Sequence, residues 1–233
     1  MAKQVLPGVY QIGMLYVNAF LIAQDEITLI DSGTPKRNET IFKALSQSGK
    51  TPADLKHIAI THHHVDHTGS LASLVEATGA RTYIHPVDAL VVRGEKSPPN
   101  PATLLGRIVD RVAHPKLEPV IADEEVQDGD ELPVAGGLTV IFTPGHTAGH
   151  VSYFWPQNGG VLFAGDAAGN IVGGPGPPVG AIGGSFTEDP EQAKESFRKL
   201  AALEFDTACF GHGGFLTGQA HAAFRRAVEK MAS

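Results

Sequence analysis

The nine residues 61–69, Thr-His-His-His-Val-Asp-His-Thr-Gly, constrain the fold and the chemistry of this chain more than any other segment. They place His62, His64, Asp66 and His67 within six positions. Imidazole and carboxylate groups are common ligands of zinc, iron and manganese. Four such groups this close together would repel or strand one another unless a positive charge lay among them. A metal site is the simplest explanation, and the fold must bring this segment to further ligands.

The histidine segment lies between an expected strand and an expected helix. The β-type run Lys56–Ile60 leads directly into His62, and Thr68 is expected to cap a helix over Leu71, Leu74 and Val75 that stops at Gly79. Earlier segments show the same succession of short strands and a helix: Val9–Met14, Tyr16–Ala23, Ile27–Ile30 and the helical Lys36–Ser48. Catalytic groups of strand–helix folds usually lie on such loops. The pattern therefore indicates an α/β chain with the cluster at a functional edge.

The segment 87–119 is less regular than its flanks and is predicted to be a cap inserted between core elements, with a short amphipathic helix at Thr103–Val112. Its apolar residues could line an entrance for an uncharged or acylated substrate, or pack the cap onto the core: Leu90, Val91, Val92, Leu104, Leu105 and Ile108. Strands and helices then resume around a Gly/Pro-rich loop, Gly173–Gly184: Leu138–Phe142, Val151–Trp155, Val161–Ala164, helical Pro190–Leu203, Thr207–Phe210 and helical Gln219–Lys230. No repeat or linker divides the chain, so we expect one domain spanning 1–233.

Composition limits the partners of the chain. The net charge of −7 argues against an extended phosphate-binding surface, so no nucleic-acid partner is expected. Neither a signal-peptide pattern nor a run of about 18 apolar residues occurs, so we expect neither export nor a membrane span. The single cysteine, Cys209, excludes an internal disulfide framework and is expected to be a small buried residue. We expect a cytoplasmic protein acting on a small molecule; the sequence indicates no oligomeric state.

Three further ligand candidates are flanked by glycine, which lets the backbone approach a metal closely: His146 in Pro-Gly-His-Thr, Asp166 in Ala-Gly-Asp and His212 in Gly-His-Gly. Alternate side chains of an extended segment point the same way, so His62 and His64 should share a face while His63 points away. The pair Asp66–His67 is displaced toward a second position. The cluster can therefore hold two ions side by side, but it needs these distant groups to complete their coordination.

At this point the chain resembles the metallo-β-lactamase superfamily over nearly its full length. The family's His-x-His-x-Asp-His signature corresponds to the segment 62–67, and the later ligands match His146, Asp166 and His212 in order. Leu-Ile-Asp-Ser-Gly at 29–33 also resembles the first motif of the family, whose Asp supports the site. The resemblance implies a four-layer αββα sandwich in which two mixed sheets are flanked by helices.

The resemblance also implies a ligand set for two divalent metal ions, zinc being the expected metal and iron or manganese the alternatives. Site one would comprise His62, His64 and His146, and site two Asp66, His67 and His212, with Asp166 bridging both ions. Asp66 would also act in catalysis by orienting the nucleophile and passing a proton. The implied activity is hydrolysis of an ester, thioester or lactone bond by a metal-bridging hydroxide.

Other activities in the same superfamily remain open. Secreted β-lactamases of the common subclass have cysteine where this chain has Asp166. Thioesterases resembling glyoxalase II have a helical domain after the last ligand, whereas 21 residues (233 − 212) follow His212 here. Acyl-homoserine lactonases place tyrosine three residues after the bridging Asp, where this chain has Gly169. The main alternative is a persulfide dioxygenase with one iron; a β-lactamase, a phosphodiesterase and a non-catalytic metal-binding module are less well supported.

The remaining histidines are expected to be structural or solvent-facing: His57, His63, His85, His114, His150 and His221. His150 follows His146 by four residues and could lie near the site, but it is not selected as a ligand. Asp31 is expected to hydrogen-bond the ligand loop rather than to bind metal.

Overall fold

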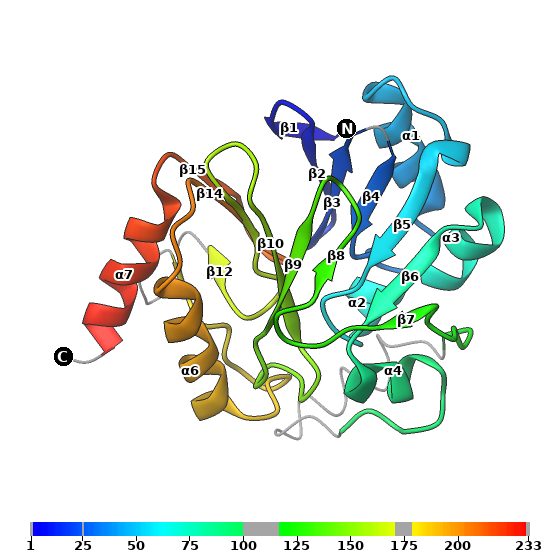
Figure 1. The fold of residues 1–233 in the computed structure, drawn as a ribbon. Helices are drawn as coiled ribbons and strands as arrows, with labels where there is room; N and C mark the ends of the chain where they lie inside the picture. The colour runs from blue at the N-terminus through cyan, green and yellow to red at the C-terminus, as the bar shows by residue number, and fades with distance from the viewer. Residues whose placement is uncertain (1, 25, 100–116, 171–178, 232–233) are drawn as a thin grey trace.

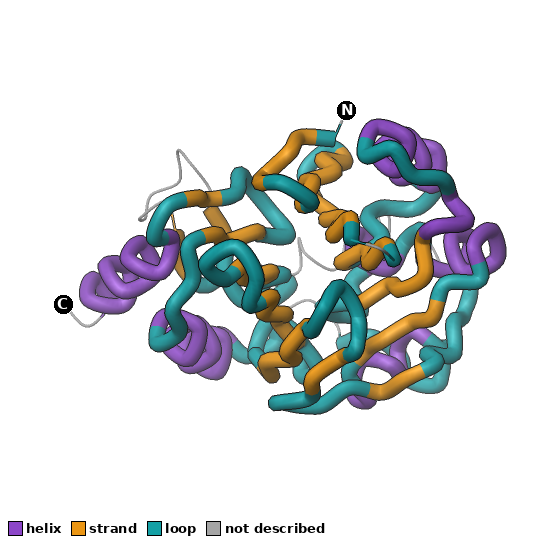
Figure 2. The backbone as a smooth tube through the Cα atoms, turned by 45° about the horizontal axis from the view of Figure 1, so that its top comes forward, coloured by secondary structure: helices purple, strands orange, loops and turns teal. Residues whose placement is uncertain are grey.

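The computed structural model describes residues 2–24, 26–99, 117–170 and 179–231. Two mixed β-sheets pack face to face, and helices cover their outer faces (Figure 1). The view in Figure 2 shows the helices at both outer sides with the strands between them. The predicted four-layer αββα sandwich is confirmed.

The first sheet contains seven strands in the order of the chain: β1 (Lys3–Leu6), β2 (Val9–Met14), β3 (Val17–Ala23), β4 (Ile27–Ile30), β5 (Leu55–Ala59), β6 (Arg81–Ile84) and β7 (Glu124–Glu125). The pairs from β1 to β4 are antiparallel, and those from β4 to β7 are parallel. The helical segments that accompany this sheet are α1 (Asn38–Gln47), a 3₁₀ turn (Pro52–Asp54), α2 (Val65–Thr68), α3 (Leu71–Thr78) and α4 (Pro86–Val92). Since β4, β5 and β6 run parallel, their carboxyl ends lie at one edge.

The second sheet has the order β15 (Leu216–Thr217), β14 (Thr207–Cys209), β11 (Val161–Phe163), β10 (Val151–Trp155), β9 (Leu138–Phe142) and β8 (Glu131–Leu132). Here β11 and β14 are parallel neighbours, so their carboxyl ends also meet. A short ribbon pairs β12 (Gly169–Asn170) with β13 (Val179–Gly180). Two helices, α6 (Pro190–Ala201) and α7 (Ala220–Met231), pack on the outer face.

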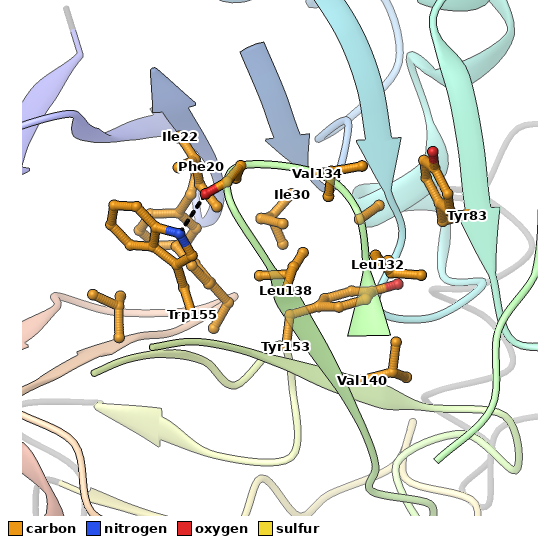
Figure 3. Close-up of a cluster of buried hydrophobic side chains, with 14 of the residues drawn as sticks. Phe20, Ile22, Ile30, Tyr83, Leu132, Val134, Leu138, Val140, Tyr153 and Trp155 are labelled. Atoms are coloured by element: carbon orange, nitrogen blue, oxygen red, sulfur yellow. Dashed lines mark hydrogen bonds between the residues drawn. The ribbon is translucent and has the colours of Figure 1, made fainter. Parts of the chain in front are cut away.

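Three apolar clusters hold the four layers together. Figure 3 shows the central one, where Phe20 and Ile30 of the first sheet face Tyr153 and Trp155 of the second. The buried indole N–H of Trp155 donates to the Ala135 carbonyl at 2.8 Å, so its polar atom is satisfied within the core. The outer clusters join each sheet to its helices. Burial on both faces explains why β4 is buried along its whole length and is apolar at three of its four positions.

Several predicted elements have the expected bounds, namely Val9–Met14, Ile27–Ile30, Leu138–Phe142 and Val151–Trp155. The cap predicted at Thr68 was wrong: the residue that caps the start of α3 is Ser70, and Thr68 ends the separate turn α2. The predicted stop of this helix at Gly79 is confirmed. A Cβ at Gly69 would lie 2.4 Å from Pro35 and 2.5 Å from the Val65 carbonyl, so the chain needs glycine at this bend.

Part of the predicted cap can be placed. Residues 86–92 form α4, whose Ala89 packs in the outer core of the first sheet. The predicted helix Thr103–Val112 and residues 173–178 of the Gly/Pro-rich loop lie outside the described residues, so the cap and the single domain stay predictions. Among the helices that the structure describes, none has the length and apolarity to span a membrane.

Candidate metal centre

All seven predicted metal ligands come from segments that follow strand ends at one edge of the sandwich. The segment 62–67 follows β5, His146 lies on the β9–β10 loop, Asp166 follows β11 and His212 follows β14. Parallel pairing of β4 with β5 and of β11 with β14 places these ends side by side. The fold thus brings together groups that are as much as 150 residues apart (212 − 62).

The histidine segment is shaped by Asp31 at the end of β4. Asp31 has a positive φ of 59°, and its Oδ1 accepts the backbone N–H of Thr61 at 2.8 Å. The side chain and backbone of Ser32 both donate to the His67 carbonyl. These bonds hold the histidine segment at both of its ends, Thr61 and His67, and Asp31 has the loop-bonding role expected from the sequence.

The ligand atoms form three overlapping groups, in each of which all atoms lie within 4.8 Å of one another. The first triplet comprises His62, His64 and His146, and the second triplet comprises Asp66, His67 and His212. The remaining group joins His62 and His67 to Asp166. The structure therefore brings together every residue of the two predicted sites, in the predicted combinations.

Asp166 lies between the two triplets. Its Oδ2 is 3.3 Å from Nε2 of His146 in the first triplet and 3.1 Å from Nε2 of His212 in the second. Its Oδ1 is 3.5 Å from Nε2 of His67. The Asp166 side chain is only 3% exposed, and its two oxygens face histidines of both triplets.

Most of the histidines are oriented by a hydrogen bond at the ring nitrogen that faces away from the centre. These outer contacts are His62 Nδ1 with Thr61 Oγ1 at 3.0 Å, His67 Nδ1 with Asp31 Oδ2 at 2.8 Å, His146 Nδ1 with Thr187 Oγ1 at 3.2 Å and His212 Nδ1 with the Tyr16 carbonyl at 2.8 Å. In His64 it is Nδ1 that faces inward, 3.1 Å from Nε2 of His146. Such outer partners fix ring orientation and tautomer in metal sites.

The inner atoms fit a cation. His62 Nε2, His67 Nε2 and Asp166 Oδ1 are buried, and none has a hydrogen-bond partner among the described residues. Leaving buried polar atoms unpaired is costly, and these three converge in one group. A donor set of imidazoles and carboxylates suits zinc, iron or manganese. The residues present therefore fit bound metal.

The first triplet is kept neutral by burial. Burial and the neighbouring histidines hold the pKa of His62 and that of His64 well below the usual value. Burial likewise lowers the pKa of His146, although Asp166 opposes this. A neutral imidazole has a free lone pair, so these three rings are ready to bind a cation near neutral pH.

The second triplet has the opposite electrostatics. Burial would lower the pKa of His67, but Asp166, Asp31 and Asp66 raise it to about 10. Burial is likewise overcome at His212, whose pKa is raised by its hydrogen bond to Asp166. The pKa of Asp166 is held well below its usual value against burial, chiefly by His67 and His212. In the absence of a cation, protons on these histidines supply the positive charge beside the carboxylates.

Two further histidines, His63 and His150, lie beside the ligands; the direction of His63 was predicted, whereas the contact made by His150 was not. His63 points away from the centre, and its Nδ1 lies 3.1 Å from Asp88 Oδ2. His150, expected to be structural or solvent-facing, is fully buried directly beside the site: its Nε2 accepts the Asp166 backbone N–H at 2.9 Å. Burial lowers the pKa of His150 to about 3, which keeps Nε2 available as an acceptor. The four-residue spacing from His146 was the available signal.

Further residues that contact the site were missed because nothing local marks them. Tyr16, on the β2–β3 turn, stacks its ring on His212 with centroids 5.9 Å apart and planes 4° apart. Thr187 supports His146, and Asp88 contacts the His63 segment. Cys209 is fully buried, as expected. Of the other histidines, His57 contacts Tyr83 and Glu26, and His114 lies outside the described residues.

A family model described as the metallo-beta-lactamase superfamily matches residues 12–212, a span that contains all seven ligand candidates. The chain belongs to the metallo-β-lactamase superfamily. The resemblance inferred from the motifs is thereby confirmed.

Individual proteins are similar to most or all of this chain. A probable metallo-hydrolase, YflN, of Bacillus subtilis is 30% identical, with 91% of this chain and 86% of that protein covered. A hydroxyacylglutathione hydrolase of Chromohalobacter salexigens is 31% identical over 82% of this chain, which spans only 58% of that enzyme. A solved metallo-beta-lactamase of Cronobacter sakazakii, mutated in its HARLDQ motif, is similar with a TM-score of 0.73 and 26% identity, covering 100% of this chain and 96% of its own.

Proposed function

We propose that this superfamily member is a hydrolase that holds two divalent metal ions and cleaves an ester, thioester or lactone bond of a small molecule. The observation that carries the proposal is the position of Asp166, whose Oδ2 contacts His146 of the first triplet and His212 of the second. A carboxylate shared in this way can serve two cations at once. One ion would be held by the first triplet and the other by the second, with Asp166 common to both.

Two such ions would polarise the acyl oxygen of the substrate and lower the pKa of a water molecule enough to supply hydroxide near neutral pH. Zinc is the metal that we expect, because imidazole and carboxylate ligands suit it. Within the chain, Thr61, Asp31, Thr187 and the Tyr16 carbonyl keep the rings in place through their outer nitrogens.

Asp66 is the residue that we assign to proton transfer. Its Oδ2 lies 3.6 Å from Nε2 of His212, and its side chain is 12% exposed, so the carboxylate lies beside the second triplet and is partly accessible to solvent. Hydrolysis joins the oxygen of water to the acyl carbon and breaks the bond to the leaving oxygen or sulfur, which must gain a proton. The Asp66 carboxylate can receive the proton from water and return it to the leaving atom.

The relatives favour acyl substrates. Hydroxyacylglutathione, named in the Chromohalobacter salexigens and Idiomarina loihiensis relatives, is a thioester. These relatives support the thioester and its oxygen counterparts as the substrate class of this chain. The absence of a nucleic-acid partner and the cytoplasmic location remain predictions.

The test combines metal counting with a hydrolysis panel. The protein is purified anaerobically, its metals are counted by mass spectrometry, and lactones, thioesters, esters and phosphodiesters are offered. We expect two ions per chain and turnover of at least one acyl substrate, with both reduced in His146→Ala. His221→Ala is the matched control, since His221 pairs with Glu204 near the start of α7 and holds no candidate ligand position.

Two outcomes would overturn the proposal. One iron per chain, with oxygen consumed on a persulfide, would establish the dioxygenase alternative. The other outcome is metal binding without turnover of any acyl substrate. Cleavage of a phosphodiester would then favour a phosphodiesterase, and no cleavage of any substrate in the panel would favour a non-catalytic metal-binding module.

A further inference from the structure

A buried carboxylate outside the ligand set connects the two sheets beside the metal centre. Asp88 lies in the first turn of α4, and its side chain is only 2% exposed. Since β6 runs parallel beside β5, the helix that follows β6 begins next to the segment that follows β5. Asp88 is thereby placed against the histidine segment, where the loop between β9 and β10 also arrives.

Asp88 accepts hydrogen bonds from both of these loops. The backbone N–H of His63 donates to Oδ2 at 2.9 Å from the first sheet. From the second sheet, the Thr147 hydroxyl donates to Oδ2 at 2.7 Å and the Gly149 backbone N–H donates to Oδ1 at 2.9 Å. The two loops therefore share one carboxylate, and both of its oxygens are used.

The donors are immediate neighbours of the first triplet. His63 lies between His62 and His64, and Thr147 follows His146 directly. The His63 ring also turns toward Asp88, with Nδ1 3.1 Å from Oδ2, which leaves its two neighbours facing the centre. A shift of this carboxylate would move the two loops that must meet to form the triplet.

The β9–β10 loop and the first turn of α4 are in close contact at Gly149. A Cβ at position 149 would lie 2.4 Å from Asp88 Oδ1 and 2.6 Å from the Asp88 backbone nitrogen. Only glycine permits this approach, so the β9–β10 loop is seated directly on the first turn of α4. The residue at position 149 and the carboxylate fit each other.

The second triplet depends on other groups. Its His67 is held by Asp31, and its His212 is held by the Tyr16 carbonyl and stacks on the Tyr16 ring. Neither support includes Asp88. Loss of Asp88 should therefore affect one metal position and spare the other.

We infer that Asp88 is a positioning residue that sets the separation of the His62/His64 segment from the His146 loop, and so determines the affinity of the first triplet for its ion. The inference rests on the proposed function, since it presupposes an ion at that triplet. Groups that support metal ligands from outside typically change metal affinity by about 10–100-fold. A change of this size, confined to one ion, is what distinguishes positioning from general stability.

The experiment uses Asp88→Asn, which keeps the side-chain shape but presents an N–H₂ group to one of the donors. Metal-free protein is titrated with Zn²⁺ against a competing chelator. We expect one ion to bind about 10–100-fold more weakly and the other to stay within about twofold of the unmodified protein. Asp123→Asn is the matched control, because Asp123 also accepts from a backbone N–H and a hydroxyl, both of Thr82 on β6, a strand that carries no ligand candidate.

Assignment of the weakened ion uses two further backgrounds. In His212→Ala, which retains the first triplet, Asp88→Asn should weaken the remaining ion; in His146→Ala it should have no further effect. Thr147→Val removes a single bond to the same carboxylate and should weaken the same ion by a smaller factor, which keeps the test valid should Asp88→Asn not fold.

Equal weakening of both ions, or unchanged affinity in both Asp88→Asn and Thr147→Val, would overturn the inference while leaving the proposed function intact. Unmodified protein that binds no ion would overturn both. If the unmodified protein holds one ion, the dinuclear proposal fails, and the His212→Ala and His146→Ala backgrounds still decide whether Asp88 controls the first triplet.

Discussion

The two triplets of the metal centre are adjacent, yet they are built on opposite electrostatic terms. His62, His64 and His146 are all imidazoles, and burial lowers the pKa of each. In the second triplet, carboxylates raise the pKa of His67 and of His212. Burial therefore keeps the histidines of the first triplet neutral, whereas nearby carboxylates favour protonated histidines in the second triplet.

The triplets also differ in exposure. In the second triplet the side chains of His212 and Asp66 are 22% and 12% exposed, whereas in the first triplet only His64 is partly exposed and His62 and His146 are buried. Solvent thus reaches the second triplet more readily than the first.

The largest effect should come from the residue that the two triplets share. Asp166→Ala removes the carboxylate between His146 and His212, so we expect loss of at least one of the two ions and a fall in acyl hydrolysis of more than about 100-fold. Metal counting and steady-state kinetics measure both. Asp206→Ala, an exposed carboxylate just before β14 at the opposite end of the sheet, is the control. Full metal content and turnover in Asp166→Ala would contradict the shared role.

The second prediction separates the triplets by pH. In metal-free protein His67, with its pKa raised to about 10, carries a proton at neutral pH that an incoming ion must displace. Raising the pH removes this competition, so zinc affinity at the second triplet should increase about tenfold per pH unit for each proton displaced. The first triplet is already deprotonated and should change little over the range from about pH 6.5 to 8.

This comparison can be measured with one triplet intact at a time. His146→Ala leaves the second triplet and His212→Ala leaves the first, and each is titrated with Zn²⁺ at a series of pH values. The slope should be steep in His146→Ala and shallow in His212→Ala. Equal slopes would show that the carboxylates do not distinguish the two positions.

The smallest effect is expected at Tyr16. Tyr16→Ala removes the ring that stacks on His212 but keeps the carbonyl that bonds His212 Nδ1. A stacking contact contributes about 0.5–1.5 kcal/mol, so the second triplet should bind zinc roughly 2–10-fold more weakly. Chelator competition measures this change. Leu15→Ala is the control, because Leu15 is the adjacent residue and is 83% exposed, and it should leave the zinc affinity unchanged. An equally large loss of zinc affinity in Leu15→Ala would indicate a disturbed turn rather than lost stacking.

Much of the fold was predictable because its strands are short, buried and apolar. The bounds of β2, β4, β9 and β10 agree with the alternation or continuous apolarity of their residues. β6 was not predicted. Within it Thr82 is buried, and its backbone N–H and hydroxyl donate to the distant Asp123 carboxylate. Such compensation cannot be read from neighbouring residues.

The sequence by itself determined which groups can bind metal, since the spacing within 62–67 and the glycines beside the later ligands are local features. Only the tertiary structure decided what each of these groups touches. It turned His63 toward Asp88, placed His150 beneath Asp166 and set Asp166 between the two triplets. The physical reason is that these contacts join loops from two different sheets, and their meeting depends on how the sheets pack rather than on any pattern along the chain.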